Sequence, residues 1–523
     1  MRILIEQIKV DLNATDKDIF DIARARITGT RAFSYSGAFY IYKRSVDARK
    51  KDNIKIVCTV CAEVEAKRSN LDTAYLESKG IKIFTEEKID ITPKAIPSVP
   101  PLIVGFGPAG MLCALVLARA GYKPVVIERG ADIDTRVKDV EEFYKTGALN
   151  GDSNIQFGAG GAGTFSDGKL TTRINDGKCA FILRTFYEHG APEDIMYKAK
   201  PHIGTDKLRG VVKSIEEEIV RLGGRVDYNT RLLSFDGNIA RTTSGEYHFS
   251  DIVLAIGHSA RDTYKYLMDK GFVVEPKAFS VGVRIEHLQS ELNEAMYGSF
   301  AQDKRLGAAD YNVSYRENGR GVYSFCMCPG GEVVAAASED GGVVVNGMSV
   351  YARNGKNANS AMCVQINRED YGSTPEKAIE FQRSLERSAY KAGGCDYTAP
   401  CQTLGDFYEG KAVTEPKRIA PTYMNGKVKI CDINGILPRT VCDYLKMGIK
   451  EFGKKIKGFD AKDVPITGVE TRTSAPLRIM RNEAYSAIAH ENVYPCGEGA
   501  GYAGGIMSAA VDGVNVALAI LKK

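Results

Sequence analysis

The stretch Leu102-Ile-Val-Gly-Phe-Gly-Pro-Ala-Gly110 decides the fold of this chain, because a short apolar run enters a glycine turn there. An apolar helical pattern follows over residues 111–120, and then a second apolar run, Val125-Val-Ile127, which ends at Glu128. In a dinucleotide-binding unit the first glycine allows a tight turn, the second admits a pyrophosphate, and the third lets the helix pack on the strand. The acid about twenty residues later accepts the ribose hydroxyls. The complete order therefore predicts a Rossmann-type nucleotide site.

A second glycine-rich turn, Gly497-Glu-Gly-Ala-Gly-Tyr-Ala-Gly-Gly505, stands near the other end of the sequence. It follows a strand-like run over residues 492–496 and opens an apolar helical segment over residues 506–521. No further strand follows, so this helix is expected to pack on the sheet built earlier. A helix N-terminus carries unpaired N–H groups and a partial positive charge. We therefore expect both turns to bind one large cofactor, FAD, from opposite ends of the sequence.

A third match to the glycine spacing, Gly158-Ala-Gly-Gly-Ala-Gly163, lacks the helical pattern behind it. The residues that follow, Thr164-Phe-Ser-Asp-Gly-Lys169, favour a loop. Glycine permits close backbone approach, so the expectation is a loop that lies against the ring system of the cofactor.

Composition limits the class of protein. The chain has 523 residues, 44% hydrophobic and 26% charged, and a net charge of +5, which is ordinary for a globular protein of several domains. The N-terminal residues lack the unbroken apolar core of a signal peptide, and no segment is long and apolar enough to span a bilayer. The twelve cysteines have irregular spacing. We expect a cytoplasmic protein with reduced thiols, no membrane partner and no metal site.

The first 93 residues have the pattern of a separate module. Strand-like and helical runs alternate in the order βαββαβ, which predicts a small ferredoxin-like domain. Prolines at 93, 97, 100 and 101 mark its end. The basic segment Lys43-Arg-Ser-Val-Asp-Ala-Arg-Lys-Lys51 is interpreted as a solvated connection between strands, with an anion or nucleic-acid role as the less favoured alternative. Cys58 and Cys61 are interpreted as buried structural thiols rather than a zinc or redox pair.

Farther along, the apolar run Asp251-Ile-Val-Leu-Ala-Ile-Gly257 returns the chain to a parallel sheet, which is typical of FAD folds of the glutathione-reductase type. The expected fold class is α/β: a discontinuous Rossmann-type FAD-binding domain over residues 98–274 and 468–523. A mixed α+β substrate domain occupies residues 275–467, and the ferredoxin-like module occupies residues 1–93. The sequence gives no indication of oligomeric state.

Long stretches of the sequence resemble bacterial proteins labelled uncharacterised FAD-dependent dehydrogenases, in which a small N-terminal domain precedes the FAD domain. The matching segments are Lys43-Arg-Ser-Val-Asp-Ala-Arg49, residues 105–110, 154–169, 200–206, 257–262, 280–287, 323–331 and 468–476, and residues 497–513. The resemblance implies FAD as cofactor but no particular substrate. Many relatives are expected to carry a glutamate where this chain has Ala159, so acid chemistry from that loop is not expected.

The residues expected to bind the cofactor come from all of these glycine-rich segments. They are Gly105, Phe106, Gly107, Pro108, Ala109, Gly110, Glu128, Arg129, Gly160, Gly161, Gly163, Asp167, Gly257, His258, Gly497, Glu498, Gly504, Gly505 and Ile506. Gly105, Gly107, Gly110 and Glu128 are assigned to the ADP half and Glu498 to the ribityl chain. Gly505 and Ile506 are assigned to the pyrimidine edge of the flavin.

The candidate catalytic residues are Cys326, Cys328, His287, Arg284 and Arg472, and a packing role is the favoured interpretation of each. The alternative for His287, Arg284 and Arg472 is that they bind an anionic substrate or stabilise a reduced flavin. Regular strand alternation would place both thiols of Cys326-Met-Cys328 on one strand face, which is poor geometry for a disulfide between them. His258, Ser259 and Asp262 lie on one turn and are not expected to form a hydrolytic triad.

The expected activity is oxidation or reduction of a small molecule by hydride transfer at flavin N5, with NADH or NADPH as co-substrate in a cleft without its own Rossmann domain. Three alternatives stay open. They are a flavoprotein that binds or modifies RNA through the basic N-terminal module, a flavin monooxygenase, and a non-enzymatic flavin-bound scaffold.

Overall fold

A five-stranded parallel sheet forms the centre of the nucleotide-binding part in the computed structural model, which describes residues 1–67 and 70–523. Its strand order is β23-β11-β5-β6-β7. The strands are β5 (Leu102–Val104), β6 (Val125–Ile127), β7 (Arg225–Asp227), β11 (Ile252–Leu254) and β23 (Val493–Pro495). The run over residues 251–257 returns to this sheet as β11, as expected, and the C-terminal strand β23 pairs with it at the edge.

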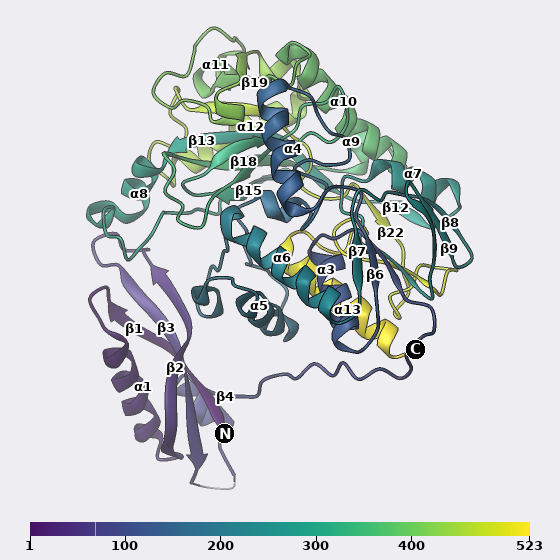
Figure 1. The fold of residues 1–523 in the computed structure, drawn as a ribbon. Helices are drawn as coiled ribbons and strands as arrows, with labels where there is room; N and C mark the ends of the chain where they lie inside the picture. Colours follow the sequence, from purple (N-terminus) through teal and green to yellow (C-terminus); the bar gives the residue numbers. More distant parts are fainter. Residues whose placement is uncertain (68–69) are drawn as a thin grey trace.

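Helices from both ends of the sequence lie side by side against this sheet (Figure 1). They are α3 (Pro108–Arg119) and α13 (Ile506–Leu521), and α6 (Thr205–Arg221) packs on α3. A Cβ atom added to Gly513 of α13 would collide with the backbone of Ala109 in α3, so the two helix backbones approach closely. Other elements of this part are α4 (Ile133–Thr146), α5 (Lys178–Glu188), α7 (Arg261–Asp269), the antiparallel strands β8 (Leu232–Asp236), β9 (Ile239–Thr242) and β10 (Gly245–His248), and the pair β12 (Val274–Pro276) and β22 (Leu477–Ile479).

A seven-stranded sheet of order β14-β15-β18-β13-β21-β19-β20 forms the second large layer (Figure 1). Its strands are β13 (Phe279–Leu288), β14 (Ser314–Glu317), β15 (Arg320–Cys328), β18 (Asn357–Ile366), β19 (Ala399–Thr403), β20 (Val428–Ile430) and β21 (Pro465–Glu470). The pair β16 (Glu332–Ala335) and β17 (Val345–Met348) and the helices α8 (Gln289–Tyr297), α9 (Arg368–Tyr371), α10 (Pro375–Gly393), α11 (Leu404–Glu409) and α12 (Arg439–Gly453) complete this part. Its core is continuous and apolar.

The N-terminal module stands apart from the main body in Figure 1. Its elements are β1 (Arg2–Asp11), α1 (Asp16–Thr30), β2 (Phe33–Asp47), β3 (Lys55–Ala66), α2 (Thr73–Ser78) and β4 (Ile81–Phe84), in an antiparallel sheet of order β2-β3-β1-β4. The module has its own apolar core. An extended stretch then crosses to the main body, where the Lys94 amide donates to the carbonyl of Leu521 (2.9 Å).

The basic segment of this module differs from the expected solvated connection. Residues 43–47 continue strand β2. The Arg44 amide donates to the Tyr197 carbonyl (2.7 Å), and the Ala199 amide donates to the Arg44 carbonyl (2.9 Å). The edge of the module is therefore hydrogen-bonded to the nucleotide-binding part. Nothing in the local sequence predicts this contact. Cys58 and Cys61 are buried free thiols, as expected.

Candidate functional site

A single cavity of about 1230 Å³ lies where the two glycine turns, the glycine loop and strand β15 meet. This volume exceeds the roughly 300–1,000 Å³ of most small-molecule sites, so it has room for a large cofactor and a substrate. The expected cofactor residues that line it are Gly105, Gly107, Pro108, Ala109, Glu128, Arg129, Gly161, Gly163, Asp167, Gly257, His258, Glu498, Gly504, Gly505 and Ile506. The structure thus brings together segments that lie hundreds of residues apart in the sequence.

Four of the expected cofactor residues lie behind the cavity wall. Gly110 is packed against the Gly105 carbonyl and the Cβ of Ala255, and a Cβ at Gly160 would meet Val212 at 2.8 Å. Gly497 approaches Ala109, where an added Cβ would come within 2.6 Å of the alanine Cβ. Phe106 is completely buried, and only its backbone takes part in the site. These residues shape the turns rather than line the space for a ligand.

Both helix N-termini at the cavity are without a side-chain cap. Helix α3 begins after Gly107 and α13 begins after Gly505, and neither glycine has a side chain that could accept a hydrogen bond from the first turn. The first N–H groups of a helix have no partner within the helix and are satisfied by caps, water or a ligand. The two helices therefore direct unsatisfied N–H groups and positive dipole ends toward the same cavity.

The Glu128 carboxylate is held in place by backbone amides. Its Oε2 accepts from the Phe106 amide (2.8 Å), and its Oε1 accepts from the amides of Gly130 (2.9 Å) and Gly158 (3.0 Å). Each carboxylate oxygen has two lone pairs, so Oε2 keeps free acceptor capacity. A rigid acceptor at the end of β6 suits ribose hydroxyls, and the residues present here fit an adenosine-containing cofactor.

Glycines leave space in the cavity that protein atoms do not fill. A Cβ at Gly107 would meet only the Cα of Gly161, at 3.7 Å, and a Cβ at Gly504 or Gly505 would meet nothing within 4 Å. Larger side chains at these three positions would occupy the cavity. The site therefore keeps room for a ligand at the N-termini of α3 and α13, which we call the helix mouths.

The side chains of Arg129 and Asp167 are engaged by protein partners. Arg129 lies over the ring of Phe157 (4.3 Å to the centroid) and pairs with Asp262 (2.6 Å). Asp167 accepts from Nε of Arg353 at 2.9 Å. Because Asp262 is bound to Arg129, it does not complete a triad with His258 and Ser259.

His258 lies in the cavity wall as a neutral ring. Burial and the nearby guanidinium groups of Arg472 and Arg261 lower the pKa of His258 to about 3. Its Nδ1 lies 2.9 Å from the Ser259 hydroxyl. A neutral imidazole can accept or donate a hydrogen bond to a ligand but carries no charge near neutral pH.

Glu498 has an unusual carboxyl group at the mouth of α13. Burial, opposed by Lys277 and assisted by Cys326, raises the pKa of Glu498 to about 7. Burial also lowers the pKa of Lys277, which lines the same cavity and was not among the sequence candidates. Near neutral pH this carboxyl group can therefore hold or release a proton beside the cavity.

Replacing Glu498 with glutamine will change how stability depends on pH. The folded pKa lies above the ordinary value of 4.5, so the folded state binds this proton more tightly than the unfolded state. The resulting stabilisation is complete below about pH 4.5 and is lost as pH rises to about 7. We expect Glu498→Gln to gain stability relative to the wild type between pH 5 and pH 8, measured by urea unfolding of the FAD-free protein. The assignment would be contradicted if the difference in unfolding free energy between Glu498→Gln and the wild type were the same at pH 5 and pH 8. The same gain in the exposed control Glu483→Gln would contradict it as well.

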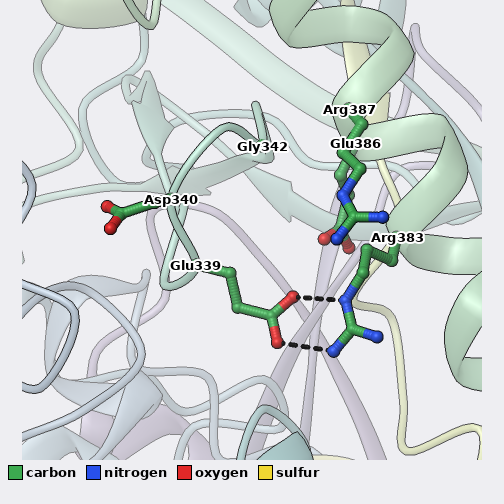
Figure 2. A pocket seen from close by; sticks show the side chains of 6 residues that line it. All are labelled: Glu339, Asp340, Gly342, Arg383, Glu386 and Arg387. Atoms are coloured by element: carbon green, nitrogen blue, oxygen red, sulfur yellow. Dashed lines mark hydrogen bonds and ion pairs between the residues drawn. The ribbon is translucent and has the colours of Figure 1, made fainter.

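A buried cluster of charged side chains holds Arg472, one of the catalytic candidates. Arg472 Nε and Arg261 Nη1 donate to opposite oxygens of Glu386 (2.8 and 2.9 Å), and Arg261 Nη1 also donates to Glu339 (2.7 Å). Figure 2 shows the outer side of this cluster, where Arg383 of α10 binds Glu339. Arg472 lines the cavity, but its guanidinium is committed to Glu386 and Ser338. The cluster joins α7, α10 and the segment after β21 rather than forming an open anion site.

Two other candidates lie outside the cavity lining. Arg284 is completely buried, pairs with Glu470 (2.8 Å) and donates to the Cys326 carbonyl (2.7 Å). His287 bonds to the Phe459 carbonyl (2.9 Å), and burial lowers the pKa of its ring to about 4. Neither side chain is therefore placed to contact a ligand in this cavity.

The two cysteine candidates differ from the expected regular alternation. The pairing of β15 with β18 shifts register between Phe325 and Cys328, and Cys326 has a left-handed backbone (φ +43°). Cys326 lines the cavity, whereas Cys328 is completely buried. Strand periodicity alone does not reveal a bulge, which is why the sequence did not separate them.

The parallel sheet, the two uncapped helix mouths and the cavity between them define a Rossmann-type nucleotide-binding flavoprotein. A family described as "FAD-dependent protein, C-terminal domain-like" matches residues 278–473. A protein of Clostridium beijerinckii (strain ATCC 51743 / NCIMB 8052), described as "Uncharacterized protein", is 48% identical over 493 residues, which is 92% of each chain. The chain belongs to the same family as this clostridial protein, and the match over residues 278–473 identifies its cofactor as FAD.

Solved structures show weaker similarity. Aklavinone-11 hydroxylase in complex with FAD and aklavinone is 14% identical, with 81% of this chain and 62% of that chain covered and a TM-score of 0.33. Glycine oxidase from Geobacillus kaustophilus is 11% identical, with 81% and 95% covered and a TM-score of 0.32. The family assignment rests on the sequence matches alone.

Among the described residues, no helix combines the length and the apolar character needed to cross a membrane. The same residues contain no group of three or more His, Cys, Asp or Glu side chains placed to hold a metal ion.

Proposed function

We propose that the protein oxidises or reduces a small molecule by hydride transfer at N5 of FAD, with NADH or NADPH as co-substrate. The observation that carries this proposal is the cavity itself, which the two helix mouths share with β15 of the seven-stranded sheet. FAD, when bound, supplies the group that accepts or delivers the hydride. The nucleotide-binding part and the sheet part would then act as the cofactor and substrate sides of one site.

Each side of the cavity has its own task in this proposal. The mouth of α3, with Gly107, would bind the pyrophosphate, and Glu128 would accept the ribose hydroxyls. The mouth of α13 would stabilise negative charge at the pyrimidine edge of the flavin, with Glu498 at the ribityl chain. The same proposal includes the division into domains. The FAD-binding domain would comprise residues 98–274 and 468–523 in a glutathione-reductase-type arrangement, the substrate domain residues 275–467, and a ferredoxin-like N-terminal domain residues 1–93.

The substrate side is lined by aromatic and polar groups. Tyr311, Tyr323 and Phe325 line the cavity together with Lys169 and Lys277. Aromatic walls with a few cations suit a compact, partly apolar molecule that carries negative charge or hydrogen-bond acceptors. All twelve cysteines are free, which agrees with a protein of the reducing cytoplasm.

Anaerobic mixing with NADH and with NADPH tests the function. The purified protein should show a flavin absorption spectrum, and one of the two nucleotides should bleach it within the time of mixing. Reoxidation by pools of metabolites, followed at the same wavelength, would then identify the substrate class. A purified protein without bound flavin that also fails to bind added FAD would refute the proposal.

A further inference from the structure

Two thiols lie one residue apart at the end of β15, beside the cavity. From Val322 to Phe325 the strand pairs regularly with β18, and the register then shifts so that Cys328 lies opposite Asn359. The left-handed conformation of Cys326 costs a residue with a side chain roughly 1–3 kcal/mol and is retained where the surroundings require it. Bulges of this kind re-aim a side chain next to active sites.

The two thiols have different access to the cavity. Cys326 is partly exposed and lines it, whereas Cys328 is completely buried, with its Sγ 3.3 Å from the Cys326 carbonyl oxygen. In dithiol chemistry an accessible thiol attacks and a sheltered thiol resolves the mixed disulfide. The bulge therefore leaves Cys326 accessible from the cavity and keeps Cys328 sheltered.

The charges around the pair favour a thiolate at Cys326. Arg284 donates to the Cys326 carbonyl from the sheet, and Lys169 of the glycine loop bonds to the Met327 carbonyl. A hydrogen bond from the Cys328 thiol, followed by the charges of Arg284 and Lys169, lowers the pKa of Cys326 to about 5. The same hydrogen bond and burial raise the pKa of Cys328. The acidic groups that face the pair are Asp167, Glu470 and Glu498.

Other buried cysteines lack this environment. Burial raises the pKa of Cys401 on β19 to about 12 and the pKa of Cys442 in α12 to about 11. Neither of these thiols lines the cavity. A structural thiol is therefore expected to resemble Cys401 and Cys442, and Cys326 differs from both.

We propose that Cys326 and Cys328 form a redox-active dithiol on the substrate side of the flavin cavity, with Cys326 as the attacking thiol, Cys328 as the resolving thiol and a disulfide as the substrate class. This inference rests on the proposed function, because FAD and a reduced nicotinamide must supply the electrons.

The proposed reaction proceeds by thiol–disulfide exchange. The Cys326 thiolate attacks one sulfur of the substrate disulfide, so that an S–S bond to the substrate forms and the other substrate sulfur leaves as a thiolate. The Cys328 thiol gives its proton to the departing substrate thiolate, and its sulfur attacks Sγ of Cys326, which releases the second substrate thiolate and leaves a Cys326–Cys328 disulfide. Two electrons from NADH or NADPH, passed through FAD, and a proton return this disulfide to a thiolate and a thiol.

Alkylation of the reduced holoenzyme tests the nature of Cys326. Iodoacetamide labelling across pH 4.5–9.5, mapped by peptide mass spectrometry, should show half-maximal labelling of Cys326 near pH 5. In Cys328→Ala, which removes the donor, this midpoint should move up toward about 8.5, the ordinary thiol value. The matched control Cys363→Ala changes a buried thiol on the adjacent strand β18 and should leave the midpoint unchanged. Labelling of Cys326 only above about pH 8 in the wild type would overturn the inference.

A second measurement follows the disulfide itself. After diamide oxidation, the peptide with Cys326 and Cys328 should lose two hydrogens in mass, and anaerobic NADH or NADPH should restore both thiols. If the nicotinamide bleaches the flavin but the thiols stay oxidised, the dithiol inference fails while the proposed function stands. If the protein binds no flavin, the proposed function fails, and the electron transfer to the dithiol fails with it.

Discussion

Replacing Gly107 with alanine will remove most of the FAD from the protein without unfolding it. The backbone of Gly107 is in an ordinary extended conformation (φ −79°), and the added methyl group would meet protein only at the Cα of Gly161, 3.7 Å away. The methyl group would instead occupy the space next to the mouth of α3. Overpacking of this kind costs about 1–3 kcal/mol, which corresponds to roughly 5- to 150-fold weaker binding. Fluorescence titration of the FAD-free protein measures this loss directly.

The matched control for this variant is Gly210→Ala. Gly210 lies within α6 (Thr205–Arg221), away from the cavity lining, and its added Cβ would meet no atom within 4 Å. An alanine there should bind FAD as the wild type does and gain roughly 0.5–1 kcal/mol of stability, because glycine is unfavourable inside a helix. Unchanged FAD affinity in Gly107→Ala would show that the cofactor phosphates do not approach this turn.

Replacing Glu386 with glutamine will cause the largest loss of stability. Glu386 is the shared acceptor of Arg261 and Arg472, and all three side chains are about 2% exposed. These guanidinium groups hold the pKa of Glu386 well below its usual range. Removing one partner of a buried ion pair leaves uncompensated charge and costs about 3–5 kcal/mol. The urea midpoint at pH 7 should fall accordingly, with the slope of the transition unchanged.

An exposed glutamate of the same helix provides the control. Glu380 of α10 pairs with Arg383 and Arg387, but its side chain is 56% exposed. Surface ion pairs are worth about 0–1 kcal/mol, so Glu380→Gln should unfold close to the wild-type midpoint. An equal fall of the urea midpoint in both variants would mean that α10 is sensitive to any change of charge. The buried cluster would then contribute no more to stability than an exposed ion pair.

The nucleotide-binding half of the site could be predicted from local sequence because each part has a local cause. Glycine positions follow from the turn between β5 and α3, and the position of Glu128 follows from the length of α3 and β6. The packing of α13 on the earlier part of the fold was expected because no strand follows the second glycine turn, whereas the pairing of β23 with β11 is known only from the structure. Local patterns of this type carry enough information to place backbone elements.

The substrate half could not be predicted in the same way because its partners are distant in sequence. Arg261 and Glu386 meet across 125 residues, and Arg284 and Glu470 across 186. A candidate residue such as Arg472 therefore looked free to bind substrate when its charge is already committed to Glu386. The bulge at Cys326 is set by the pairing with β18 and has no local signature of its own.

The order of synthesis has a consequence for how this flavoprotein is loaded. The edge strand β23 and helix α13 are translated after β5, β6, β7 and β11 and after the whole seven-stranded sheet. Domains generally fold as units while the ribosome proceeds, but here the nascent chain exposes an unpaired edge of β11 until residues 493–495 emerge. The cavity therefore cannot be complete until β23 and α13 have been synthesised, because the turn between them forms part of its wall.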